Sequence, residues 1–269
     1  MSRPDIALRA LSDARRAVAA WSAAVALLVS GMVAAYPSVR DQAADLTRLL
    51  DSYPDALKAF MGLSGIDYAS GAGYLRAELF GFTVPLLLLV LAIGRGASSV
   101  AGEEDRGTLD LLLATPVRRR RVVAEKAAGV VAVVALVAGA LWAALAASAA
   151  GFGLGVPPVR TAAAVGAAAL LAVVFGMVAL AAGAVTGRRG LAVGLATALA
   201  TAAFVLESLA RIIDGLRPWR WLSPFAYYRD ADPLARGLPP KETAVLVAIA
   251  LVAAVAGVTG FARRDVRGR

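Results

Sequence analysis

Hydrophobic residues gather in six long runs, and polar residues fill the segments between them. Each run carries little or no charge and approaches the ~20 residues that a helix needs to cross the hydrocarbon core of a bilayer. The predicted spans are residues 18–36, 79–95, 127–151, 161–187, 190–207 and 243–262. The pattern predicts an all-α polytopic membrane protein with six transmembrane helices in a single domain over residues 1–269.

The N-terminal region allows two interpretations. Residues 1–17 alternate arginines with apolar positions, which predicts a short amphipathic helix on the membrane surface ahead of the first span. The same basic start followed by an apolar run is also compatible with a cleaved signal peptide. However, residues 33–37 make a poor small-residue cleavage site, so an uncleaved first helix is favoured.

The second span and the segment before it are less regular. Pro85 predicts a break or kink in this helix, and residues 74–82 are expected to extend it outward. The preceding segment, 37–78, contains two stretches that look like short amphipathic helices, at 41–50 and 55–61.

Lys and Arg are denser in the segments that face one side of this arrangement. They crowd at the N-terminus, in residues 101–126, at 187–190 and at the C-terminus, and they are sparse in the longer segments 37–78 and 207–242. By the positive-inside rule, both termini are predicted to be cytoplasmic, with the two longer segments outside.

Composition agrees with a membrane protein and narrows its chemistry. The chain is 59% hydrophobic with a mean hydropathy of +0.72. Its net charge of +9 does not indicate nucleic acid as a partner, because the basic residues cluster at the ends of apolar runs. There are no Cys and no His, and there is no phosphate-binding glycine loop. We therefore expect no catalytic site, no metal and no cofactor in this chain.

Residues 101–126, between the second and third spans, form the only long charge-dense segment that lies between two apolar runs each long enough to cross a bilayer. Glu103 and Glu104 come first, and Thr108 is placed to cap a short helix. Leu109, Leu112 and Leu113 would share one face of that helix, and Pro116 would start the next one. This predicts an amphipathic helix along the membrane surface; the simpler alternative is a solvated, positively charged loop.

The chain resembles the type-2 ABC transporter permeases, the six-helix membrane subunits of bacterial exporters. Three pieces carry the resemblance: residues 101–126, which include Ala101-Gly102-Glu103-Glu104 and Leu111-Leu112-Leu113-Ala114-Thr115-Pro116; residues 221–238, which include Trp221-Leu222-Ser223-Pro224-Phe225 and Asp232-Pro233-Leu234; and the ending Phe261-Ala262-Arg263-Arg264-Asp265. The resemblance covers essentially the whole chain.

The resemblance implies a function as well as a fold. The loop after the second span would be a coupling helix that contacts a separate ATPase subunit, present in two copies and holding ATP and Mg. The residues expected to face that ATPase are Glu103, Glu104, Gly107, Thr108, Leu109, Leu112 and Leu113, with Pro116 holding the turn into the third span.

A second permease subunit, identical or different, would complete the pore in the cell inner or plasma membrane, and short re-entrant helices would lie between the fifth and sixth spans. The alternative function is a non-transporting subunit that relays ATPase motion to a partner outside.

Polar and aromatic residues after the fifth span form the other candidate site. Glu207 and Arg211 lie four residues apart, either as a polar site at the pore exit or as a local ion pair. Trp221, Phe225 and Tyr227 are expected to be aromatic anchors at the outer interface or part of a substrate-binding surface.

Overall fold

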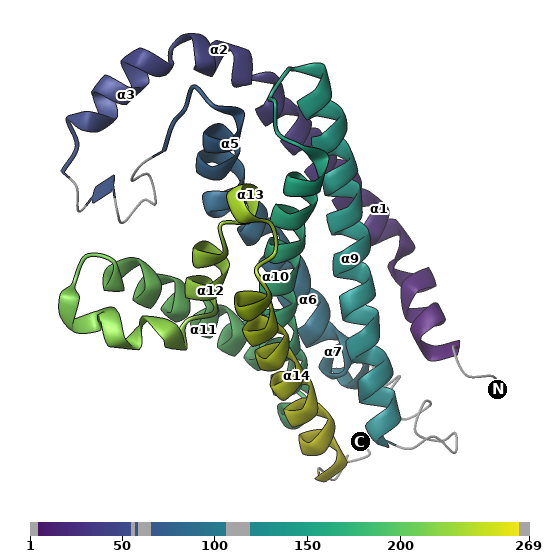
Figure 1. Cartoon of the computed structure of the whole chain (residues 1–269). Helices are drawn as coiled ribbons and strands as arrows, with labels where there is room; N and C mark the ends of the chain where they lie inside the picture. The colour runs from purple at the N-terminus through teal and green to yellow at the C-terminus, as the bar shows by residue number, and fades with distance from the viewer. Residues whose placement is uncertain (1–4, 55–56, 59–65, 106–118, 264–269) are drawn as a thin grey trace.

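The computed structural model describes residues 5–54, 57–58, 66–105 and 119–263, and within them it is built from helices without strands (Figure 1). Six of its helical stretches are long and apolar enough to cross a membrane. The prediction of an all-α polytopic membrane protein is therefore confirmed. The long helices are α1 (Asp5–Ala34), the composite of α5 (Gly71–Tyr74), η1 (Leu75–Thr83) and α6 (Val84–Ser99), then α9 (Arg119–Gly151), α10 (Pro158–Thr186), α11 (Arg189–Ala210) and α14 (Pro240–Arg263).

The N-terminal surface helix predicted for residues 1–17 is not a separate element. Helix α1 runs without interruption from Asp5 to Ala34, because no proline and no glycine occurs where the two helices were expected to part. It is followed by α2 (Tyr36–Asp41) and α3 (Ala43–Asp51), which extend away from the bundle (Figure 1). The second short helix expected, at 55–61, falls mainly outside the described residues.

The irregularity expected at Pro85 begins earlier in the chain. Residues 75–83 form a π-helix, and Pro85 stands in the first turn of the α-helix that follows. The wider turn suits this place, because proline has no N–H to donate and its ring crowds the preceding turn. The hydroxyl of Thr83 donates to the carbonyl of Glu78, five residues back, at 2.9 Å.

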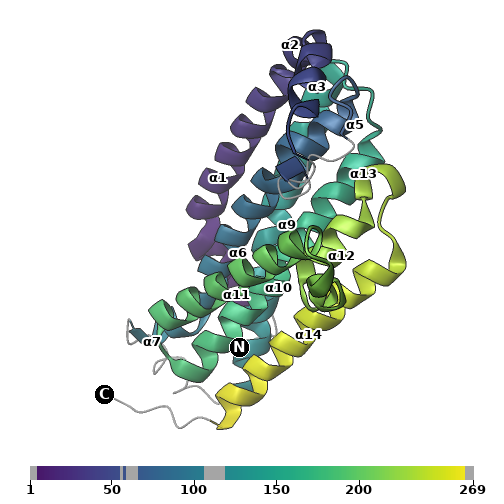
Figure 2. The same ribbon diagram turned by 90° about the vertical axis from the view of Figure 1, so that its left-hand side faces the viewer.

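Helix α10 is the centre of the bundle, and α6, α9, α11 and α14 all pack against it (Figure 2). Helices α6 and α10 cross closely because a glycine of each helix, Gly96 and Gly176, lies at the crossing point. A Cβ added at Gly96 would lie 2.1 Å from the carbonyl oxygen of Gly176. Small residues allow such backbone contact between membrane helices, where van der Waals packing is a main source of association. Helix α1, by contrast, packs mainly on α9 at the edge of the bundle.

The two ends of the bundle differ in what they carry. The start of α1, the end of α14 and α7 (Ala101–Asp105) lie toward one end, while α2, α3 and α5 lie toward the other (Figures 1 and 2). We call these the α7 end and the α2 end. Between α11 and α14 the chain forms three short helices: η2 (Asp214–Leu222), α12 (Pro224–Ala231) and α13 (Pro233–Arg236).

Candidate functional site

The carboxylate of Glu207 lies near the end of α11 and is completely buried, at 0% exposure. One oxygen accepts a hydrogen bond from Nε of Arg211 at 2.5 Å, and the other accepts from Nη1 of Arg229 on α12 at 2.7 Å. A buried charge is tolerated only when it is paired and hydrogen-bonded, and two guanidinium groups meet that condition here. The local pair predicted between Glu207 and Arg211 is thus present, within a larger network.

Asp230 extends the network to η2. Its Oδ1 pairs with Arg220 and lies 3.5 Å from Nη2 of Arg211. Burial lowers the pKa of Arg229 from its ordinary value, and the nearby carboxylate of Glu207 opposes that shift. The ordinary value is so high that the guanidinium stays charged at neutral pH. Glu207 and Asp230 together therefore tie α11, η2 and α12 through charged groups.

Ser223 fixes the place where α12 begins. Its hydroxyl accepts from the backbone N–H of Phe225 at 3.2 Å as a helix cap, and it donates to the carbonyl of Ala203 on α11 at 2.7 Å. Pro224 at the first helical position suits the helix start. Asp232 ends the helix with φ 42°, in the left-handed region, which turns the chain into α13.

The three aromatic residues predicted to act together lie in different surroundings. Phe225 is buried, with its ring centroid 5.7 Å from that of Phe175 and 5.5 Å from that of Phe204. Trp221 is exposed, and its ring centroid lies 5.7 Å from that of Tyr227. Phe225 therefore belongs to the packed interior, while Trp221 and Tyr227 remain near the surface.

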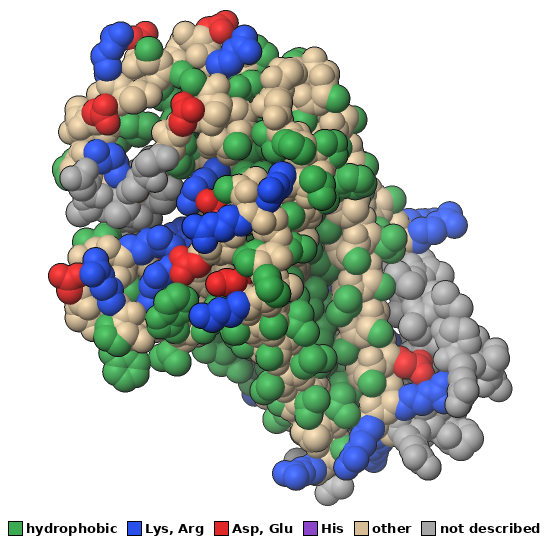
Figure 3. Space-filling view, in the orientation of Figure 1, with side chains coloured by type: hydrophobic (Ala, Val, Ile, Leu, Met, Phe, Trp, Pro, Cys, Tyr) green, Lys and Arg blue, Asp and Glu red, His purple; other side chains and the backbone are tan. Residues whose placement is uncertain are grey.

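A cavity of about 610 Å³ lies beside this network. Figure 3 shows Lys and Arg side chains gathered with Asp and Glu over the region of η2, α12 and α13, whereas hydrophobic side chains dominate the face below it. Tyr228 lines the cavity and donates its hydroxyl to the carbonyl of Phe80 at 2.8 Å; burial raises the pKa of this hydroxyl, so it stays protonated. The lining residues are Arg76, Phe80, Gly81, Ala210, Arg211, Arg217, Arg220, Trp221, Tyr228, Arg229, Asp232, Pro233 and Leu234.

Sequence reasoning singled out Glu207, Arg211 and Trp221 but missed the other charged members of this site. Arg229-Asp230 follows directly on an aromatic stretch, and a charged pair in such a position could have served as a signal. Arg76 offers no comparable signal. It stands on η1 and pairs with Asp232 at 3.3 Å, across 156 residues of sequence.

At the α7 end, the acidic residues of the predicted coupling segment are in contact with the bundle. Glu103 pairs with Lys126 of α9, whose side chain is only 7% exposed. Glu104 is half-buried on the same short helix, and α7 contacts α6, α10 and α11. The remaining predicted coupling residues, Gly107, Thr108, Leu109, Leu112, Leu113 and Pro116, lie outside the described residues. The docking role of this segment stays a prediction.

Six apolar helices with α10 at their centre, and charged groups collected between the helices at both ends of α11, define a multi-pass membrane protein. A family model described as ABC-2 family transporter protein matches residues 5–266, and the chain belongs to that family. No curated protein gives a significant match to the chain. The resemblance to type-2 ABC permeases is thereby confirmed: the chain is the permease component of an ABC transporter, and membership implies association with an ABC ATPase and a partner permease.

Proposed function

We propose that this chain is the membrane-spanning permease subunit of an ATP-driven exporter, coupled to its ATPase through residues 101–117. The observation that carries the proposal is the placement of α7. This short acidic helix contacts α6, α10 and α11, and the Glu103–Lys126 ion pair joins it to α9. A displacement applied to α7 would thus reach four of the long helices without passing through a loop.

The α7 end is the cytoplasmic end in this proposal. It collects the start of α1, the end of α14 and the arginines Arg119–Arg121 at the start of α9, as the positive-inside rule favours. A soluble ATPase can push only on a part of the permease that reaches the aqueous phase. ATP and Mg are bound and used in that partner, and the permease contributes the path through the membrane.

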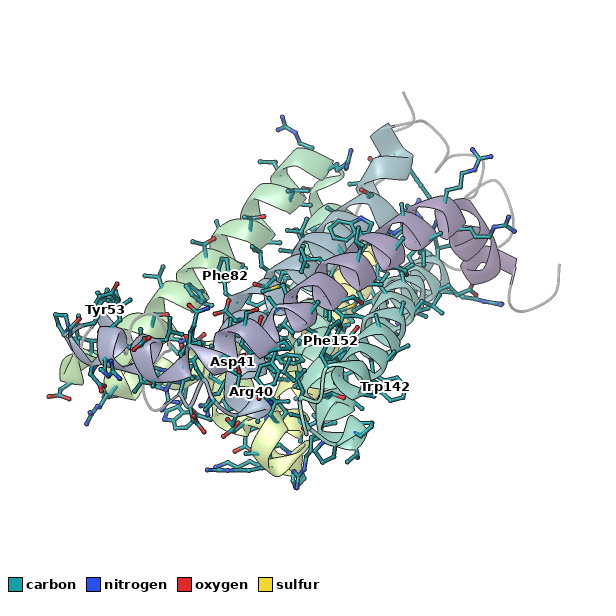
Figure 4. The ribbon with its side chains drawn as sticks, turned by 90° about the horizontal axis from the view of Figure 1, so that it is seen from above. Arg40, Asp41, Tyr53, Phe82, Trp142 and Phe152 are labelled. Carbon is teal, nitrogen blue, oxygen red and sulfur yellow. The ribbon has the colours of Figure 1, made fainter. Side chains whose placement is uncertain are left out.

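A second permease subunit would cover the apolar faces of α6 and α11. Leu191, Leu195 and Leu199 recur every four residues along α11 and are exposed. Phe82 of η1 lies on the side of α11 when the molecule is seen from above (Figure 4), with its ring centroid 6.0 Å from that of Phe204. We propose that these neighbouring faces meet the same faces of a second copy. Leu195→Cys in this cysteine-free chain should cross-link as a dimer in native membranes; recovery of monomers only would contradict this interface.

The test of coupling uses Glu104, because changing Glu103 would also disturb its ion pair with buried Lys126. Glu104→Lys reverses one charge of α7 and should leave the permease folded while weakening ATPase binding. Loss of one charge contact at an interface costs about 2 kcal/mol or more, roughly a thirtyfold change in affinity. Co-purification of the ATPase and ATP-dependent transport in reconstituted vesicles should both fall.

The matched control is Asp45→Lys on α3, a charge reversal of an exposed acid at the other end of the molecule. It should leave both measurements at the wild-type level. Wild-type co-purification and transport in the Glu104→Lys variant would show that α7 does not form the contact.

A second function is supported by the arm formed by α2 and α3. This arm extends from the bundle at the α2 end (Figure 1), and Leu49 on α3 and Tyr53 just after α3 are exposed. An apolar surface outside the bundle suits a subunit that passes ATPase motion to an external partner. ATPase activity that is stimulated by membrane-permeant compounds in reconstituted vesicles favours the exporter. ATPase activity that requires an added external protein favours the second function.

A further inference from the structure

The cavity between η1, the end of α11, η2, α12 and α13 is rich in guanidinium groups. Five arginines line it, from η1, η2, α12 and the end of α11, against one acidic lining residue, Asp232. These are Arg76, Arg211, Arg217, Arg220 and Arg229. The cavity volume of about 610 Å³ lies within the range of cavities that hold small ligands.

The carboxylates of Glu207 and Asp230 do not belong to the lining and pair with three of the five arginines, whereas Arg76 pairs with Asp232 and Arg217 pairs with Asp214. Glu207 holds Arg211 and Arg229, and Asp230 holds Arg220 and Arg211. Each guanidinium has five N–H groups, whereas each of these ion pairs uses one nitrogen of its arginine. Carboxylates outside the cavity thus orient these three arginines and leave donor groups directed elsewhere.

Arg220 supplies a separate observation. Its Nε is buried and has no hydrogen-bond partner among the described residues. A buried charged donor without a partner carries a desolvation cost, so such a group is expected to meet an acceptor that the chain itself does not supply. The guanidinium is also held over the ring of Trp221, 5.0 Å from its centroid, which restricts where that donor can point.

Most of the other lining residues are apolar. Phe80, Trp221, Pro233 and Leu234 contribute hydrophobic surface beside the arginines. A ligand that satisfies both parts has an anionic group next to an apolar one. A planar carboxylate offers two oxygens, whereas a phosphate presents oxygens in several directions and can meet guanidinium groups from several elements at once.

We propose that this cavity binds the phosphate-bearing headgroup of an anionic amphiphile. This proposal assigns a binding site to the permease itself, separate from the proposed export function, and binding to it can be measured without the ATPase. The same chemistry could be supplied by a lipid of the bilayer or by soluble phosphate, so the experiment includes both sources.

The experiment measures lipid binding to the purified full-length chain by native mass spectrometry. The probes are phosphatidylglycerol, which has a net negative charge, and phosphatidylcholine, in which choline offsets the phosphate. The wild-type chain should retain phosphatidylglycerol in preference. The variant Arg76→Gln/Arg217→Gln should bind it at least about tenfold more weakly, as expected for the loss of charge-assisted hydrogen bonds.

These two arginines are chosen because their side chains are 51% and 69% exposed, so their replacement leaves the buried Glu207 network intact. Arg217→Gln alone provides a milder variant should the double variant fold poorly. Arg48→Gln, at a side chain 78% exposed on α3 and away from the cavity, is the matched control and should bind as the wild type does.

Inorganic phosphate is then added as a competitor. Binding that depends on the arginines and resists phosphate assigns the site to a lipid headgroup, and binding that phosphate displaces assigns it to the phosphate group itself. Equal retention of the two lipids by the wild-type chain, or unchanged retention of phosphatidylglycerol by the arginine variants, would overturn the proposal.

Discussion

Two ion-paired carboxylates, Glu207 near the end of α11 and Glu103 on α7, lie in different surroundings. Glu207 is fully buried and receives two arginines, one from its own helix and one from α12. Glu103 is less buried, with its side chain 19% exposed, and pairs with Lys126 of α9. Arginine offers a planar fork that can serve several acceptors, whereas lysine is a compact charge on a mobile stem.

We propose that the two sites have separate mechanical roles. Around Glu207, charged groups from α11, η2 and α12 hold one another, and Ser223 adds a hydrogen bond from the start of α12 to α11. These contacts fix how α11, η2 and α12 are arranged beside the arginine-lined cavity. At Glu103 the ion pair joins a helix of only five residues to a long one, which suits a contact that transmits motion.

The largest loss of stability is expected for Glu207→Ala, which removes the buried carboxylate. The variant removes the carboxylate and leaves the largely buried guanidinium of Arg229 facing an empty space without its partner. We expect the free energy of unfolding to fall by about 3 kcal/mol or more, as is typical when one partner of a buried pair is removed. Unfolding in mixed micelles by titration with sodium dodecyl sulfate measures it. Glu207→Gln keeps the shape and one acceptor and should lose less; a change below about 0.5 kcal/mol in Glu207→Ala would refute the structural role of this carboxylate.

Lys126→Met should have a smaller effect. The methionine retains most of the buried apolar volume of the lysine stem, and Glu103 keeps partial access to water. We expect a loss of about 1–2 kcal/mol in the same titration, and a larger relative loss of ATP-dependent transport. The double variant Lys126→Met/Glu103→Gln should recover part of the stability but not the transport, because the two residues are coupled. Additive losses of stability would argue against a direct pair.

Asp45→Asn is the control for both titrations. Its partner Arg48 is exposed on α3, and exposed pairs contribute well under about 1 kcal/mol. The variant should unfold as the wild type does, and a large loss would mean that the arm of α2 and α3 supports the bundle more than its exposure indicates.

Local pattern was enough to predict six apolar helices and the class of fold. A membrane helix needs about 20 apolar residues whatever surrounds it, so run length alone reveals it. Local spacing also found the Glu207–Arg211 pair, since residues four apart share a helix face. The separate helix expected at residues 1–17 was wrong because a change from polar to apolar sequence does not by itself end a helix; Asp5 to Ala34 contains no breaker at that point.

Tertiary structure alone decided the rest of the site. Arg76 meets Asp232, and Glu103 meets Lys126, only because distant helices are packed side by side. Gly96 is one of many glycines in the sequence, and its importance appears where α6 crosses α10 against Gly176. Sequence determined which segments enter the membrane, because the hydrophobicity of each segment sets the free energy of inserting it into the bilayer. Which charges meet depends on how helices pack, and that is a property of the whole chain.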